Sequence, residues 1–64
     1  MKLSHAQRET LACIADEPTP LEDFETHEER HTLGRLQSLG LVSLNGCLVY
    51  ATELGRSISR EITG

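Results

Sequence analysis

Apolar residues recur at helical spacing near the start of the chain, which predicts an amphipathic helix over residues 4–16. Leu11, Ile14 and Ala15 fall on one face of this helix. Ser4 is followed three residues later by Gln7, which is the pattern of a capping box. In such a box each side chain binds a backbone N–H group that the helix itself leaves unpaired. The first helix is therefore indicated by its start as well as by its apolar face.

A second, short helix is predicted directly after the first. Thr19 and Glu22 repeat the capping pattern, and Pro20 occupies the expected first helical position, where its missing N–H has no cost. Leu21 and Phe24 lie three residues apart. We expect Phe24, the one phenylalanine of the chain, to anchor this helix in the core.

The third predicted helix covers residues 27–39. Thr26 and Glu29 give a third capping pattern at its start, and Gly40 follows its end as a residue that tolerates positive φ. Its apolar stripe consists of Leu33, Leu36 and Leu39. Because the second and third helices are nearly contiguous, they predict a helix-turn-helix.

The helical spacing ends at Leu41, and residues 41–50 predict a β-hairpin. Asn45-Gly46 lies between two β-prone runs and favours a type I′ turn with positive φ at both residues. The expected cross-strand pairs are Leu44 with Cys47, Ser43 with Leu48, Val42 with Val49 and Leu41 with Tyr50. Both faces of this hairpin are largely apolar, so one would cover the helices and the other would form a contact surface.

A last helix follows the hairpin, with Thr52 as its N-cap. Its apolar stripe consists of Leu54, Ile58 and Ile62, with Arg56 and Arg60 off the stripe. The element order predicts one α+β, mainly α, domain over residues 1–64: three helices, a two-stranded hairpin and a C-terminal helix. A chain of 64 residues buries a small core, so a partner or a second copy would add stability. An independent enzyme with a deep cleft is not expected.

Composition points to a cytoplasmic protein. No apolar run approaches the length of a membrane span, and the chain opens on a polar capped helix where a signal peptide would have an apolar core. Cys13 and Cys47 have apolar neighbours and no CxxC spacing, so we interpret both as reduced thiols that act as small hydrophobes. The sequence indicates no cofactor.

The net charge of −4 is unevenly distributed along the chain. Residues 1–29 carry eight acidic and two basic side chains, whereas residues 30–64 carry two acidic and four basic ones. The acids between Asp16 and Glu29 would repel phosphate wherever they face it.

Two segments resemble winged-helix transcriptional regulators. These are Leu33-Gly-Arg-Leu-Gln-Ser-Leu-Gly-Leu-Val-Ser-Leu and, after a tight turn, Tyr50-Ala-Thr-Glu-Leu-Gly-Arg. In that family a recognition helix leads through a Leu-Gly-Leu-Val-type junction into the wing, and a Tyr-x-Thr-x-x-Gly segment starts the final helix. The resemblance implies a winged helix-turn-helix fold, binding to double-stranded DNA and regulation of transcription as a homodimer. The predicted wing departs from a basic one because it has no Lys or Arg.

The segment His27-Glu28-Glu29-Arg30-His31 matches the H-E-x-x-H string of zinc metalloproteases. A zinc enzyme also needs a third protein ligand and an open coordination position, and no later residue is a recognisable third ligand. We therefore predict neither a metal site nor catalysis here. Glu28 and Glu29 are better explained by the favourable position of acids at a helix N-terminus.

A helical wheel with the leucine stripe inward places the basic residues of the third helix on its outer face. The outward residues are His27, Arg30, His31, Gly34, Arg35 and Ser38. We select Arg30, His31, Arg35 and Ser38 as candidate DNA-binding residues. Arg binds guanine or phosphate, and a glycine on this face allows close approach of the backbone. The same face is also explained as an ordinary solvated surface. The alternative function is a protein-interaction module that uses the acidic stretch and the apolar hairpin face.

Overall fold

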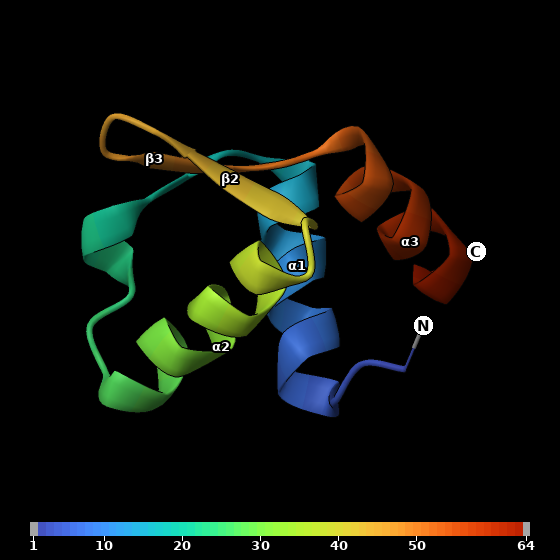
Figure 1. The fold of residues 1–64 in the computed structure, drawn as a ribbon, viewed down its shortest axis with the longest axis horizontal. Coiled ribbons are helices and arrows are strands. Elements are labelled where there is room, and N and C mark those ends of the chain that lie inside the picture. Colours follow the sequence, from blue (N-terminus) through green and yellow to red (C-terminus); the bar gives the residue numbers. More distant parts are fainter. Residues whose placement is uncertain (1, 64) are drawn as a thin grey trace.

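A computed structural model of the chain describes residues 2–63, and the side-chain surroundings of residues 2–61. The elements are α1 (His5–Asp16), β1 (Thr19–Pro20), the 3₁₀ helix η1 (Leu21–Asp23), α2 (His27–Ser38), β2 (Val42–Asn45), β3 (Leu48–Ala51) and α3 (Glu53–Thr63). The three strands form an antiparallel sheet in the order β1-β3-β2. Helix α1 contacts α2, α3 and β3, and the hairpin lies across the helices and extends beyond them over η1 (Figure 1). The protein is thus an α+β, mainly helical domain.

One hydrophobic core joins the helices to the sheet. Its buried members are Leu11, Ile14, Phe24, Leu33, Leu36, Leu41, Val42, Val49 and Ala51. The apolar faces predicted for the first and third helices are confirmed, because Leu11, Ile14, Leu33 and Leu36 are all buried. Phe24 is also buried, as expected for a core anchor.

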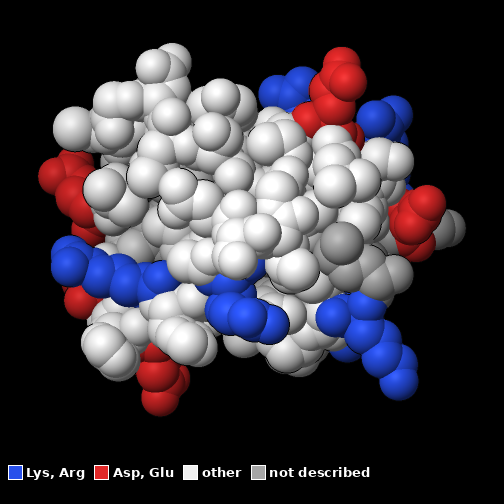
Figure 2. Space-filling model, in the orientation of Figure 1, with Lys and Arg blue, Asp and Glu red and all other residues white. Residues whose placement is uncertain are grey.

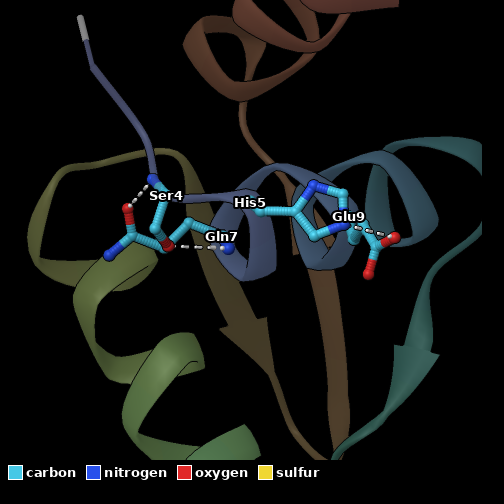
Figure 3. Close-up of polar contacts among 4 residues, drawn as sticks. All are labelled: Ser4, His5, Gln7 and Glu9. Atoms are coloured by element: carbon cyan, nitrogen blue, oxygen red, sulfur yellow. Dashed lines mark hydrogen bonds and ion pairs between the residues drawn. The ribbon is translucent and has the colours of Figure 1, made fainter.

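Two of the three predicted capping patterns mark real helix starts. At α1, the Ser4 N–H donates to Gln7 Oε1 at 2.9 Å and the Gln7 N–H donates to Ser4 Oγ at 3.2 Å (Figure 3). His5, the first residue of α1, faces Glu9 one turn later: His5 Nε2 lies 3.1 Å from Glu9 Oε1 on the exposed surface (Figure 3). At α2, the N–H of the third helical residue donates to the Thr26 hydroxyl oxygen, and that hydroxyl donates to the carboxylate of the same residue.

The predicted second helix is wrong in extent and in its start. Thr19 and Pro20 form strand β1, which pairs with β3, and one 3₁₀ turn follows them. The Thr19 hydroxyl donates to the Glu17 carbonyl and does not cap a helix. The physical reason is the Pro-Thr-Pro sequence, since a residue before proline is restricted to extended backbone. That restriction favours a strand at Thr19, and the missing N–H of Pro20 is tolerated at a sheet edge.

The hairpin is confirmed, but its predicted register is wrong. Asn45 pairs with Leu48 and Leu44 pairs with Val49, so the two turn residues are Gly46 and Cys47. Of the residues that the structure describes, no non-glycine residue has positive φ, whereas Gly46 has φ of 64°. Glycine with positive φ at the first turn position is the pattern of a type II′ turn, which replaces the type I′ turn expected at Asn45-Gly46.

The apolar stripe predicted for the last helix is also incorrect at its start. Leu54 is 49% exposed, and the buried residues between Glu53 and Glu61 are Gly55 and Ser59. Ile58 packs partly against the core, and the side chain of Ile62 lies outside the described residues. A Cβ atom at residue 55 would overlap the Leu41 carbonyl oxygen, so the close approach of α3 to this carbonyl requires glycine.

The N-cap predicted for the last helix is confirmed. The Gly55 N–H donates to Thr52 Oγ1 at 3.1 Å, and the Thr52 hydroxyl donates to the Gly40 carbonyl at 2.7 Å. Gly40 has φ of 78° and ends α2 as predicted. Thr52 therefore joins the start of α3 to the turn that follows α2.

Candidate nucleic-acid interface

The outer face of α2 presents polar and basic side chains to solvent. Its exposed residues include His27, His31, Gly34, Arg35 and Ser38. Around the helix axis these residues lie opposite Leu33 and Leu36, which are in the core. Three of the four candidate DNA-binding residues, His31, Arg35 and Ser38, therefore lie together on this face.

Both ends of α2 are fixed, which holds its outer face in one orientation. At the N-terminus Thr26 is the N-cap, and its Oγ1 accepts a hydrogen bond from the Glu29 N–H at 3.1 Å. At the C-terminus the Leu39 N–H donates to the Arg35 carbonyl and the Leu41 N–H donates to the Leu36 carbonyl. A helix held at both ends and packed through leucines presents its outer side chains as a rigid surface.

Arg30 is exposed but differs from the other three candidates. Its Nε donates to the Phe24 carbonyl oxygen at 2.9 Å and so ties α2 to the segment that follows η1. On the helix it lies on the flank next to Gln37, and both residues line an open groove with Leu21 and Leu44. The guanidinium edge that contains Nε is therefore occupied within the protein, and Arg30 has a structural role that the sequence did not reveal.

Five acidic side chains line grooves on another side of the domain from the outer face of α2, whereas the exposed Glu28 lies on α2 itself, one turn from His31 and two turns from Arg35. Two adjoining grooves share Cys13, Thr19 and Asp23 and lie between α1, β1 and η1. The carboxylates that line these grooves, which we call the acidic grooves, belong to Glu9, Asp16, Glu17, Asp23 and Glu29. Glu29 and His31 are two positions apart on α2, so they point to nearly opposite sides of the helix.

Charged side chains surround an uncharged area on the face that carries the hairpin. Figure 2 shows this broad uncharged area, Lys and Arg side chains across the lower part and at the upper right of the view, and Asp and Glu side chains at several places around the margins. The uncharged area agrees with the sequence, because no residue from Leu36 to Thr52 carries a charged side chain. The net negative charge of the whole chain therefore does not extend to the hairpin surface on this face.

The two histidines of the H-E-x-x-H segment are exposed and one turn apart on α2. Among the residues that the structure describes, no group of three or more His, Cys, Asp or Glu side chains is arranged to hold a metal ion. The arrangement of His27 and His31 gives no observation that favours zinc chemistry.

Several residues lie on the surface in the structure although the sequence analysis did not expect them there. Cys13 and Cys47 are free, but both are exposed, so neither acts as a buried hydrophobe. Leu44 and Leu21 are exposed by 39% and 36% and line the groove beside Arg30. The spacing along α2 could have shown that its Arg30 flank faces one way, but not that Leu21 of η1 and Leu44 of β2 complete the groove, because that depends on how the chain folds back on α2.

Comparisons with protein-family models, with curated proteins and with solved structures find no match to this chain. Within residues 2–63, no helix has the length and apolar character needed to cross a membrane.

Proposed function

We propose that this protein is a small winged-helix DNA-binding regulator that uses α2 as its recognition helix. One observation carries the proposal: Arg35, His31 and Ser38 share the outer face of a helix fixed at both ends, and the acidic grooves lie on another side. The order α1, β1, α2, β2, β3, α3 is compatible with a winged-helix layout. The segments that resemble winged-helix regulators, described above, lie in α2, the hairpin and α3.

The chemistry of the outer face suits the major groove of DNA. An arginine can bind guanine O6 and N7 in bidentate fashion or bind a phosphate, and histidine and serine donate to either. Gly34 has no atom within 4 Å of the position that a Cβ would occupy, so DNA could approach the helix backbone closely there. Arg30 is left out of the proposed contact because it lies on the flank of α2, where its Nε binds the Phe24 carbonyl.

The test is a fluorescence anisotropy titration of a labelled random-sequence DNA duplex at several salt concentrations. Arg35→Ala should lower the slope of log K against log salt concentration by about one if Arg35 binds a phosphate. If Arg35 reads a base, the loss of about 1 to 3 kcal/mol should appear only on a duplex that contains that base at the contacted position. The matched control is Arg60→Ala, which removes the same charge from α3, where Arg60 lies beside Asp16 and Arg56. Equal losses in the two variants would show that only net charge matters and would contradict the proposal.

A second candidate is a protein-interaction module, and the exposed apolar residues of the hairpin favour it. Leu44 and Leu48 are exposed by 39% and 45%, and no basic residue lies on the hairpin to bind phosphate. This function predicts no DNA affinity even at low salt. It also predicts that charge reversal at Glu22 and Asp23, or a polar residue at Leu48, abolishes binding to a protein partner without unfolding the domain.

A further inference from the structure

An apolar groove runs between η1, α2 and the tip of the hairpin. We define it by Pro20, Leu21, Arg30, Leu33, Leu44 and Cys47, which line two adjoining hollows that share Leu21 and Arg30. The Leu21 N–H donates to the Cys47 carbonyl at 2.7 Å, so η1 is joined to the hairpin turn at one end of the groove. The groove is therefore part of the fixed fold, and Leu21 and Leu44 are partly exposed to water in it, whereas Leu33 is buried.

The groove also contains one acidic and one basic side chain. Glu22 and Arg30 line the same hollow, together with Leu21. Neither forms an ion pair with any other residue that the structure describes, and the one interaction of the Arg30 side chain is through Nε. The terminal guanidinium nitrogens and the Glu22 carboxylate thus lie unpaired beside exposed leucines.

We propose that the apolar groove is the contact surface between two copies of this chain. In a two-fold dimer the same patch meets itself, so a residue i that contacts residue j is matched by j contacting i. Glu22 of each copy would pair with Arg30 of the other, and the leucines would lie between the two ion pairs. This surface is self-complementary because it carries both charges of the pair.

Charge favours a second copy at this place over the acidic grooves. The chain has a net charge of −4, so two copies that met through the acidic grooves would repel each other. The apolar groove has one charge of each sign, and the adjoining hairpin has none. Leu21 and Leu44 are exposed by only 36% and 39%, so a second copy has little apolar surface to bury here and we expect a weak association that depends on concentration. This inference does not depend on DNA binding, although the groove and the outer face of α2 share Gly34.

The experiment is sedimentation equilibrium from micromolar to millimolar protein, with charge reversals at the two positions. Glu22→Arg places two arginines opposite each other, and Arg30→Glu places two glutamates opposite each other, so each variant should raise the dimer Kd at least about tenfold. An equimolar mixture of the two variants restores both ion pairs and should dimerise again as a heterodimer. Glu61→Arg, on α3, makes the same change of charge outside the groove and should raise the dimer Kd less than Glu22→Arg does.

Three results would overturn the proposal. These are a wild-type protein that is monomeric at millimolar concentration, a dimer that Glu22→Arg does not weaken, and a mixture of the two variants that does not associate although both are folded. Circular dichroism checks the fold of each variant. If Arg30→Glu unfolds because the bond to Phe24 is lost, Leu44→Ser replaces it, since this exposed side chain should weaken the dimer and leave the fold intact; an unchanged Kd then overturns the proposal.

Discussion

Gly55→Ala should destabilise this protein, although alanine is the better helix former. An alanine in an unobstructed helix position stabilises by about 0.5 to 1 kcal/mol relative to glycine. At residue 55 the added Cβ overlaps the Leu41 carbonyl oxygen, a backbone atom that cannot rotate away. To relieve the overlap, α3 has to move away from Leu41, whose carbonyl accepts the Thr52 N–H at 3.0 Å. Overpacking of this kind costs about 3 kcal/mol at the upper end, so the net loss is about 2 kcal/mol.

Gly34→Ala is the matched control because Gly34 is the other glycine within a helix and has no atom within 4 Å of its would-be Cβ. This change should stabilise by about 0.5 to 1 kcal/mol, so the two variants should differ by about 3 kcal/mol. Urea unfolding followed by circular dichroism measures both, and the loss in Gly55→Ala corresponds to a fall of about 10 °C in Tm. A Gly55→Ala protein as stable as the wild type would refute the close approach of α3 to Leu41.

Other predictions test the core, the turn and the histidine pair. Leu36→Ala should cost about 2 to 5 kcal/mol, measured by urea unfolding, because Leu36 is fully buried; an unchanged stability would show that α2 does not pack through its leucine stripe. Gly46→Ala should cost about 1 to 2 kcal/mol because φ is 64° there, whereas Asn45→Ala should have little effect; equal losses at both positions would favour a type I′ turn. Zinc should not raise Tm appreciably, since His27 and His31 have no third ligand among the described residues; a large stoichiometric shift that His31→Ala abolishes would contradict this.

The sequence predicted the elements whose signals are local. Ser4 and Thr26 cap helices because their side chains reach N–H groups within one turn, and that geometry depends on neighbouring residues alone. The buried faces of α1 and α2 also follow from spacing along a single helix. The glycine at the end of α2 was predicted in the same way and has the expected positive φ.

The hairpin register could not be predicted because the two registers place each side chain on the same face. Moving the turn from Asn45-Gly46 to Gly46-Cys47 shifts the partner of every residue by two positions along the opposite strand. Because side chains alternate between the two faces with a period of two, this shift leaves each side chain on its original face. The hydrophobic pattern is therefore equally satisfied by both. The observed register, with Leu44 opposite Val49, occurs together with hydrogen bonds between residues far apart in sequence. One of these is the bond from the Thr52 N–H to the Leu41 carbonyl.

The candidate site was predicted in part. Spacing along the helix placed His31, Arg35 and Ser38 together, and all three are exposed on α2. The bond from Arg30 to Phe24 depends on how the chain turns after η1, and no sequence pattern reports it. Helix spacing predicts that Glu29 points away from His31, but the gathering of Glu29 with carboxylates of α1 and η1 is a property of packing.

The measurement that tests the central claim most directly is NMR chemical-shift mapping of the isotope-labelled protein with a short random-sequence DNA duplex at low salt. We expect the largest shifts at the backbone amides on the outer face of α2, at His31, Gly34, Arg35 and Ser38, with small shifts along α1. Signals that do not change on addition of DNA, or changes confined to α1 and α3, would contradict the assignment of α2 as a recognition helix.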